Sequence, residues 1–546
     1  MKKWEILNNG RVKEVIKTLL ENRGIKTKKE IEEFLNPKLG EVTIESVGID
    51  EKQLKKAIAR IKLAIKNKEG IVIFGDYDVD GIAGTAILWE TLNFLGAKVM
   101  PYIPHRIDEG YGLSIKGIEN IKNQYKDLKL IITVDNGIVA NTAVDFASAV
   151  GIDVLITDHH VKPKKLPGAL AIVHTTKLCG AGVAWMLTQE LRKNKTHLEL
   201  VALATVADLV PLKGANRTLL KFGLEELQKT KRIGLLELLK EAGLVRESLG
   251  VYEIGHIIAP RLNAMGRLEY AMDSLRLICT TNPKRAGDLA RLLGNTNKER
   301  QDITLQTVLH AVKRVKNQKS KLKNLLFIVH ESYEQGVIGL VAGKLVEEFY
   351  RPAIVISKGE KFSKASARSI KGFNMIEFIR SAQEFLLDAG GHPMAAGFTV
   401  ETAKLPLLQK VLEKKAELLL NKDLLTRSLK IDCELPLYSV DVKLYKSLQE
   451  LSPFGMGNPE PVFICRGVVV KDVRLVGSEG KHLKLTVGSQ KTGVILEGIG
   501  FGLGEKKPIN IADKIDIVFI LDENEWNGEK RLQLKIKDIK ISLKNT

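Results

Sequence analysis

Cysteine is scarce in this chain, and the few cysteines present lie far apart in the sequence. Of 546 residues only four are cysteine, namely Cys179, Cys279, Cys433 and Cys465. Neither the paired spacing of zinc ligands nor the pattern of a disulfide framework can be read from these positions. The cysteines therefore give no sign of a zinc site or of a disulfide-stabilised secreted domain.

Long apolar runs are also missing. No stretch approaches the roughly 18 consecutive apolar residues that a membrane-spanning helix needs, and the first residues, MKKWEILNNGRVKEVIK, lack the apolar core of a secretory signal. We therefore expect a cytoplasmic protein with no membrane partner.

Positive charge is in excess. Lys and Arg together number 84 against 65 for Asp and Glu, which gives a formal net charge of +19. An excess of this size favours a polyanionic partner, because basic side chains release counterions from phosphates. A lysine-rich soluble surface explains the same excess equally well, so charge supports a nucleic-acid partner without establishing one.

The chain is too long for one ordinary hydrophobic core, so three or four domains are expected. Residues 1–50 are mostly helical in pattern. From about residue 51, amphipathic helices alternate with short apolar strands at 71–75, 128–134 and 152–157. Strands and helices alternating at this spacing predict a parallel sheet with helices on its faces.

The second half of the sequence contains two further patterns. Residues 283–317 read as one long helix, followed by a second α/β pattern that includes NLLFIVH, GLVAGKLVEEFY and RPAIVIS. From about residue 429 the sequence changes to about five short strands separated by turn signals. That pattern predicts a small OB-like barrel.

Acidic side chains follow the first predicted strand. In GDYDVDG, Asp76, Asp78 and Asp80 stand at alternate positions, so extended backbone would point all three carboxylates to one side. Converging carboxylates repel one another strongly unless cations neutralise them. The motif therefore predicts a cation site.

Similar residues follow the other two strands. Asp135 stands in VDNG, and Asp158, His159 and His160 stand in TDHH. The carboxyl ends of parallel strands are where open α/β sheets bind ligands. A fourth candidate, Asp208, lies in the apolar stretch VALATVADLVPL, where a carboxylate needs a partner or a metal.

A single aspartate after a strand is usually a helix cap or a loop residue. A pair of histidines more often lies on the surface, or in the core with its hydrogen bonds satisfied. Coincidence explains four clusters at corresponding strand ends poorly. Carboxylates with one or two imidazoles suit Mn²⁺ or Mg²⁺ better than zinc. Two such ions roughly 3.5–4 Å apart can clamp a phosphoryl group and activate a water.

The second α/β pattern contains phosphate-binding candidates. Ser366 and Arg368 alternate along KASARS and could face one groove. In GGHPMAAGF, a backbone cradle with a cationic partner would suit a phosphate, although a packing loop explains the motif equally well; its residues are Gly390, Gly391, His392 and Gly397. Asn263 and Arg267 of RLNAMGR are weaker candidates, because Asn beside Arg is also an ordinary surface pairing.

In this order, the motifs resemble the DHH phosphoesterase superfamily and, within it, the RecJ family of single-strand-specific DNA exonucleases. The similar segments cover nearly the whole chain and include GDYDVDG, IDEGYGLS, ITVDNG, TDHH, GAGVAW, VALATVADLVPLKGANR, APRLNAMGR, GVIGLVAGKL, RPAIVIS, ASARSIKGFN, GGHPMAAGF and LSPFGMGNPEP. One short motif is weak evidence, whereas this many in register is strong evidence.

The resemblance implies an α/β protein with a parallel-sheet DHH catalytic domain, a linking helix, a second α/β DHH-associated domain and an OB-like barrel. We expect an N-terminal helical segment at 1–50, the DHH domain at 51–282 and the connecting helix at 283–320. The DHH-associated substrate-binding domain is expected at 321–428 and the OB-like nucleic-acid-binding domain at 429–546, with no further C-terminal module.

The resemblance also implies roles for residues. Two Mn²⁺ or Mg²⁺ ions would be held by Asp76, Asp78, Asp80, Asp135, His159 and Asp208. His160 would lie beside the scissile phosphate, and Asp158 would orient the histidines from behind. The implied activity is 5′-to-3′ hydrolysis of single-stranded DNA in repair and recombination. Single-strand-binding protein or a helicase are candidate partners, and we expect a monomer.

The sequence departs from the family pattern in two places. The usual Asn-Pro after TDHH is replaced by VHTTKLCGAGVAW with a shortened loop, and Glu334 stands where a histidine is expected. Two alternatives therefore stay open. One is a DHH enzyme that cleaves short oligoribonucleotides or cyclic dinucleotides, and the other is a non-catalytic DHH scaffold that binds DNA.

Overall fold

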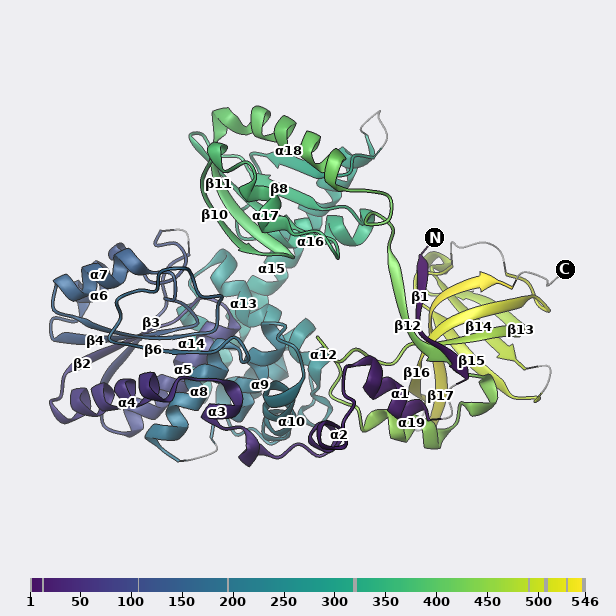
Figure 1. Cartoon of the computed structure of the whole chain (residues 1–546), viewed down its shortest axis with the longest axis horizontal. Coiled ribbons are helices and arrows are strands. Elements are labelled where there is room, and N and C mark those ends of the chain that lie inside the picture. Colours follow the sequence, from purple (N-terminus) through teal and green to yellow (C-terminus); the bar gives the residue numbers. More distant parts are fainter. Residues whose placement is uncertain are drawn as a thin grey trace. The chain divides into compact units, whose positions relative to one another are not determined.

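The computed structural model describes residues 2–542 apart from 12–13, 107, 194–195, 318–321, 490–491, 505–508 and 527–528; for 9–11 and 526 only the backbone is described. The chain forms two compact units. The larger unit comprises residues 42–210 and 219–427, and the smaller unit comprises residues 1–41, 211–218 and 428–546 (Figure 1).

The larger unit begins with a five-stranded parallel sheet in the order β3-β2-β4-β5-β6. Helices α6 and α7 cover one face, and α4, α5 and α8 cover the other (Figure 1). Because both faces are covered, the central strands β2, β4 and β5 are nearly continuous buried runs, as predicted. The elements are α3 (Ile44–Val47), α4 (Glu51–Lys66), β2 (Gly70–Phe74), α5 (Val79–Phe94), β3 (Lys98–Tyr102), α6 (Ile115–Gln124), β4 (Leu128–Val134), α7 (Asn141–Ala149), β5 (Asp153–Asp158), β6 (Ala171–His174) and α8 (Gly180–Leu191).

A helical region follows this sheet and ends in the predicted long helix, which is α15 (Pro283–Lys316). Asn282 caps α15 by accepting a hydrogen bond from the N–H of Arg285 at 3.1 Å, and proline at its first position suits a helix start. The preceding helices are α9 (Leu198–Ala207), α10 (Gly214–Gln228), α11 (Ile233–Glu241), α12 (Val251–Glu253), a π-helical turn (Ile254–Ile258), α13 (Ala259–Leu268) and α14 (Met272–Cys279).

The remainder of the larger unit is a second, mixed sheet in the order β10-β11-β9-β8-β7. Strands β7 and β8 are parallel, whereas the other neighbours are antiparallel. The elements are β7 (Leu326–His330), α16 (Ile338–Phe349), β8 (Ala353–Ser357), β9 (Phe362–Arg368), α17 (Met375–Arg380), β10 (Leu386–His392), β11 (Ala395–Glu401) and α18 (Leu405–Leu419).

The smaller unit is built around the predicted OB-like barrel. Its five strands run in the order β13-β14-β15-β17-β16, and a pairing of β13 with β16 closes the barrel. The strands are β13 (Phe463–Val476), β14 (His482–Gly488), β15 (Ile495–Gly500), β16 (Lys514–Trp526) and β17 (Glu529–Ile541), preceded by β12 (Ser428–Glu434) and α19 (Val442–Gln449). None of the described helices in either unit is long and apolar enough to cross a membrane.

The N-terminal segment, predicted to be mostly helical, begins instead with a strand, β1 (Lys3–Arg11), before α1 (Val15–Asn22) and α2 (Lys28–Leu35). Strand β1 pairs in parallel with β12, and Trp4 and Ile6 pack against a small core that includes Ile431 and Val518. A pairing between residues more than 400 positions apart leaves no local pattern, which is why the sequence did not reveal it.

Two buried arginines, Arg217 and Arg23, contact the LSPFGMGNPEP motif within the smaller unit. The guanidinium of Arg217, 1% exposed, donates to the carbonyl oxygens of Phe34, Leu451 and Ser452 at 2.8, 3.0 and 2.6 Å. Burial, followed by the charge of Arg23, lowers the pKa of Arg217 to about 10. The motif, taken above as a family signature, therefore contributes backbone carbonyls to the packing of this unit.

A charged network joins α5 to the helical region of the larger unit. Arg232 donates to Glu90 at 2.6 and 2.7 Å and to Glu199 at 2.7 Å, and His197 contacts Glu90 at 2.9 Å. Burial alone would raise the pKa of Glu90, but the hydrogen bonds from Arg232 and His197 outweigh burial and lower that pKa to about 2. The network therefore favours the charged form of Glu90 in the folded protein.

We predict that this network stabilises the fold above about pH 4.5 and loses its contribution as the pH falls toward 2. The unfolded chain takes up the proton first, because the folded pKa lies below the ordinary value of 4.5. Glu90→Gln should lower the free energy of unfolding by roughly 2 kcal/mol at pH 7. Urea unfolding of both proteins from pH 7 to pH 3 measures the difference, which should shrink on acidification; a constant difference contradicts the prediction.

Candidate active site

Four acidic side chains are buried at the carboxyl edge of the parallel sheet. Asp76 follows β2, Asp135 follows β4, Asp158 ends β5, and Asp80 lies in the first turn of α5. Their exposed fractions are 2%, 3%, 1% and 1% respectively. Because the strands are adjacent and parallel, their ends bring residues distant in sequence to one place.

The GDYDVDG segment brings its aspartates to this edge of the sheet with a different backbone conformation from the one predicted. Asp78 is the N-cap of α5, and its Oδ1 accepts hydrogen bonds from the N–H groups of Asp80 at 2.9 Å and Gly81 at 3.2 Å. The chain is therefore helical from Val79, and the expected extended alternation is wrong. An aspartate suits an N-cap, so this local preference starts the helix within the motif.

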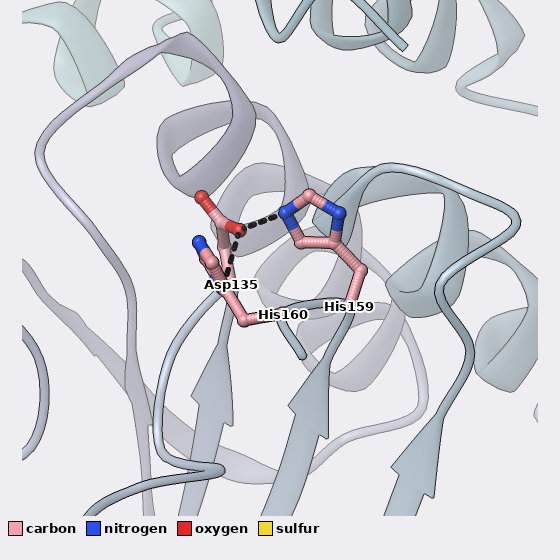
Figure 2. Close-up of side chains that lie close together, drawn as sticks. All are labelled: Asp135, His159 and His160. Atoms are coloured by element: carbon pink, nitrogen blue, oxygen red, sulfur yellow. Dashed lines mark ion pairs between the residues drawn. The ribbon is translucent and has the colours of Figure 1, made fainter. Parts of the chain in front are cut away.

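The ligand atoms form three overlapping groups, within each of which they lie within 4.8 Å of one another. The groups are Asp76, Asp78 and Asp135; Asp135, His159 and His160; and Asp80, His159 and Asp208. Figure 2 shows the second group, in which the Oδ1 atom of Asp135 lies 3.0 Å from the His159 Nε2 atom and 3.9 Å from the His160 Nδ1 atom. Asp135 and His159 therefore each belong to two groups.

Asp208 joins the cluster from a helix. It is the C-cap of α9, and its Oδ2 atom lies 3.8 Å from the His159 Nε2 atom. The interpretation that all four clusters stand at strand ends is therefore wrong for Asp208. The apolar stretch around it is a helix buried on nearly all sides, from Leu198 to Val206.

The buried acids of the cluster disfavour one another's charged forms, which nearby positive charge would stabilise. Burial and then the charges of Asp80, Asp78 and Asp76 raise the pKa of Asp135 well above its usual range. Burial and the charge of Asp80 likewise raise the pKa of Asp208 to about 8. The buried Oδ1 atoms of Asp76 and Asp135 accept no hydrogen bond within the described part of the chain, although that of Asp135 lies 3.0 Å from the His159 Nε2 atom.

A set of converging carboxylates with unpaired oxygens and one or two imidazoles fits hard divalent cations such as Mn²⁺ or Mg²⁺. Asp135 also has a left-handed backbone, with φ of 61°. That conformation is uncommon for a residue with a side chain and is concentrated at functional sites.

Asp158 orients the two histidines from behind. Its Oδ1 atom accepts hydrogen bonds from the N–H groups of His159 at 2.7 Å and His160 at 3.1 Å, and it lies 2.8 Å from the His160 Nδ1 atom. Its Oδ2 atom accepts from the Ile138 N–H at 2.9 Å. Burial opposes a charge on His160, but the hydrogen bond and charge of Asp158 raise the pKa of His160 to about 9.

A cavity of about 450 Å³ lies beside the cluster, and it is lined by loops that follow strands of the parallel sheet, by α13 and by strands of the second sheet. Ser366 and Arg368 line it, since both project from the same face of β9, and the Arg368 Nη1 atom lies 3.4 Å from the Ser366 Oγ atom. The neighbouring Ala365 and Ala367 are buried in the hydrophobic core, and Ala365 also reaches the cavity lining. The predicted alternation of KASARS is therefore observed.

The GGHPMAAGF motif is a β-hairpin rather than the predicted cradle loop. Gly390 pairs with Gly397, and His392 pairs with Ala395, between β10 and β11. A Cβ at Gly390 would meet no atom of the described residues within 4 Å, so this face of the hairpin is flat and open. Gly391 and Gly397 line the cavity.

His392 lies outside the cavity lining but beside His160 of the acidic cluster. Its ring is nearly parallel to that of His160, with centroids 6.1 Å apart and 14° between the planes. The structure therefore brings the predicted histidines of the two sheets together.

Asn263 and Arg267 both line the cavity from α13. The Oδ1 atom of Asn263 accepts a hydrogen bond from the Val79 N–H at 2.9 Å, so this side chain also fixes the start of α5. Arg267 donates to the carbonyl of Gly336 at 3.2 Å. Burial and the charges of Arg106, Arg300 and Arg368 lower the pKa of Arg267 to about 10.

Sequence reasoning missed two cavity residues, Arg106 and Tyr111. The guanidinium of Arg106 lies 5.0 Å from the ring centroid of Tyr77. The hydroxyl of Tyr111 donates to the carbonyl of Asp135 at 3.2 Å and lies 3.3 Å from the His160 Nε2 atom. Tyr111 stands in the IDEGYGLS motif, which was the one available signal, whereas Arg106 precedes that motif with no pattern of its own.

Both departures from the family pattern lie within the described residues. The shortened stretch after TDHH leads into β6, where the His174 Nε2 atom lies 2.7 Å from the carbonyl of His160. Glu334 is exposed, and its carbonyl accepts hydrogen bonds from Val337 and Ile338 at the start of α16. Neither departure removes a residue from the acidic cluster.

Comparison with known proteins assigns three regions of the chain. A model of the DHH family, N-terminal domain, matches residues 70–209, a DHHA1 domain model matches 322–418, and a RecJ OB domain model matches 431–538. The single-stranded-DNA-specific exonuclease RecJ of Bacillus subtilis is 37% identical over 97% of this chain and 68% of its own length. RecJ of Escherichia coli is 30% identical over 96% of this chain and 95% of its own length.

Solved structures agree with this relationship. RecJ from Thermus thermophilus in complex with Mn²⁺ superimposes with a TM-score of 0.84 at 28% identity, over 99% of this chain and 80% of that one. The same protein in complex with Mg²⁺ gives a TM-score of 0.77 at 27% identity, over 99% and 79%. On these matches, the chain belongs to the RecJ family of DHH proteins.

Proposed function

We propose that this chain is a metal-dependent exonuclease that hydrolyses single-stranded DNA from the 5′ end and serves DNA repair and recombination. The observation that carries the proposal is the overlap of the three ligand groups, in which Asp135 and His159 are each shared. Relatives named single-stranded-DNA-specific exonucleases support the substrate. The direction of cleavage rests on the family resemblance.

In this proposal, two Mn²⁺ or Mg²⁺ ions would be held by Asp76, Asp78, Asp80, Asp135, His159 and Asp208, and Asp135, which belongs to two of the ligand groups, would serve both. When bound, such ions neutralise the phosphate, activate a water for in-line attack and stabilise the leaving oxygen. The protein contributes a buried, pre-formed set of oxygens and one imidazole, so the ligands need no large rearrangement.

In the proposed reaction, His160 lies beside the scissile phosphate, and Asp158 holds the imidazole of His160 in place. The Asp158 Oδ1 atom holds the Nδ1 side of the imidazole at 2.8 Å, which leaves the Nε2 side directed toward Tyr111. A proton on Nε2 can then be donated to a phosphate oxygen or to the departing 3′ oxygen.

The second sheet is assigned to recognition of the strand end. The planar fork of Arg368 and the hydroxyl of Ser366 can bind phosphate oxygens, and Arg267 adds charge on the same cavity. The paired Gly390 and Gly397 carry no side chains on one face of the hairpin, and Gly391 lines the cavity together with Gly397. Asn263 lines the same cavity, and the ring of His392 lies near that of His160. A two-metal site alone cleaves any phosphodiester that reaches it, so exonuclease behaviour needs such a recognition element.

The barrel is proposed to bind the single strand beyond the cleavage site, as OB folds do. We further propose a monomer with single-strand-binding protein or a helicase as candidate partners. The domain divisions at residues 50, 282, 320 and 428 stay predictions.

One experiment tests the activity against its alternatives. The purified chain is incubated with 5′- or 3′-labelled DNA, short RNA and cyclic dinucleotides, each with Mn²⁺, Mg²⁺ or EDTA. Release of 5′-terminal mononucleotides from single-stranded DNA supports the proposal. Preference for RNA or cyclic dinucleotides, or no hydrolysis at all, favours the two alternatives instead.

We predict that Mn²⁺ stabilises the metal-free protein, because a ligand that binds only the folded state adds about 2.7 kcal/mol at a concentration of 100 times its Kd. Thermal melting should therefore shift upward, and isothermal titration should give two ions per chain. Asp302→Ala, which removes an exposed carboxylate on α15, is the matched control and should bind like wild type. A melting temperature that neither Mn²⁺ nor Mg²⁺ changes contradicts a metal centre.

Asp135→Ala is expected to reduce turnover by roughly three orders of magnitude or more, since it removes the ligand shared by two groups. Circular dichroism should show that the variant stays folded. Near-normal turnover of the folded variant would remove Asp135 from this role, and activity of the wild type in excess EDTA would exclude the metal mechanism.

Arg368→Ala is expected to raise the KM for linear single strands with little effect on Mn²⁺ affinity, because Arg368 lines the cavity but belongs to none of the ligand groups. Lys358→Ala, an exposed change in the same sheet region, is the control. The assay compares linear with circular single-stranded DNA. Equal rates on circles and linear strands, or unchanged end cleavage by the variant, contradict this account of end recognition.

A further inference from the structure

Helix α8 begins beside two of the proposed metal ligands. The N–H of Gly180 donates to the Asp80 Oδ2 atom at 2.6 Å, and the N–H of Ala181 donates to the Asp80 Oδ1 atom at 2.6 Å. The N-cap residue, Cys179, makes no side-chain cap hydrogen bond within the described part of the chain. A carboxylate from α5 therefore satisfies the N–H groups that a capping residue would normally satisfy.

Gly180 also packs directly against Asp135. A Cβ at position 180 would lie 2.6 Å from the Asp135 Cβ atom, 2.8 Å from its Oδ1 atom and 2.9 Å from its Cγ atom. These separations are far shorter than the roughly 3.5–4.0 Å at which nonbonded carbon atoms pack. Glycine is therefore required here because of the neighbouring carboxylate.

Close packing around the start of α8 fixes where both acids can lie. A Cβ at Gly84 of α5 would lie 2.5 Å from the Val134 Cγ1 atom and 3.1 Å from the Ala181 Cα atom. Helix α5, which carries Asp80, thus lies close to both the end of β4, which precedes Asp135, and the start of α8, because position 84 has no side chain. These contacts help to fix the position of Asp80 relative to Asp135.

The partial positive charge at the start of α8 also suits the two neighbouring acids. The first turn of a helix has a partial positive charge of roughly half an elementary charge. Asp80 and Asp135 are 1% and 3% exposed, so neither is neutralised by solvent. The start of α8 offsets part of their repulsion, and each oxygen of Asp80 retains a lone-pair direction for a cation after accepting one hydrogen bond.

We infer that Gly180 and Ala181 are positioning residues for the metal centre. Their N–H groups orient the carboxylate of Asp80, and the missing side chain of Gly180 leaves the space that Asp135 occupies. The inference rests on the metal site of the proposed function. It extends that site to two residues that are not themselves ligands.

A purely structural role predicts a different result from a positioning role. Alanine favours a helix more than glycine does, so Gly180→Ala should leave the melting temperature unchanged or raise it if only helix formation matters. A positioning role predicts weaker metal binding whatever happens to the melting temperature. Metal affinity therefore separates the two roles.

The experiment titrates Mn²⁺ into full-length wild type, Gly180→Ala and Gly182→Ala, and records the melting of each metal-free protein. We expect Gly180→Ala to raise the Kd for Mn²⁺ at least tenfold while it still melts cooperatively. Gly182→Ala is the matched control, because its Cβ would meet side chains of Leu178 and Cys179 rather than an acid. Its Kd should stay within about twofold of wild type.

A third variant, Ala181→Pro, removes one donor to Asp80 at a position in the first helical turn, where proline is tolerated. It should weaken Mn²⁺ binding similarly, and it decides the matter if Gly180→Ala does not fold. Wild-type affinity in folded Gly180→Ala or Ala181→Pro overturns the inference, as does an equal loss in Gly182→Ala. Absence of Mn²⁺ binding by wild type overturns the proposed function, and the inference with it.

Discussion

Buried carboxylates repel one another at one edge of the parallel sheet, and the rest of the larger unit must hold them there. Asp76, Asp80 and Asp135 are almost wholly removed from water, and the pKa of Asp76 and of Asp135 is raised well above its usual range by burial and by neighbouring acids. Such a cluster persists only if the surroundings supply positive charge and if the chain cannot relax away from it. The buried strand β2 and the helices on both faces prevent relaxation, and the start of α8 supplies part of the charge.

The opposite charge accumulates on the cavity next to this cluster. Arg267 and Arg368 line the cavity with Arg106, and burial together with mutual repulsion lowers the pKa of both Arg267 and Arg368. The charged side chains of the cavity are thus basic apart from Asp78, whereas the neighbouring cluster is acidic. Under the proposed function, a metal-bound phosphate ester would offer negative charge to the guanidinium groups and a ligand to the metal ions.

Local patterns in the sequence predicted much of this arrangement. Apolar patterns predicted the strands β2, β4 and β5, the helix α15 and the barrel strands. Position after strands predicted most residues of the acidic cluster, and apolar surroundings pointed to Asp208. Contacts between distant residues were not predictable in this way. The pairing of β1 with β12 has no local signature, and the hairpin of Gly390 and Gly397 was mistaken for a loop because consecutive glycines are typical of both. The start of α5 inside GDYDVDG was missed because the capping preference of Asp78 was not weighed against extended alternation.

The acidic cluster works against the stability of the fold. Asp135 has a left-handed backbone, the Oδ1 atom of Asp76 accepts no hydrogen bond within the described residues, and several acids repel one another. Local rules of stability are broken in this way mainly at functional sites, where other parts of the molecule must compensate. In the larger unit, compensation comes from the buried parallel strands and from the Glu90–Arg232 network, which anchors α5 at the end opposite Asp80. Helix α5 is thus held by the Glu90–Arg232 ion pair near one end and, at the other, by the hydrogen bonds that Asp80 accepts from the start of α8.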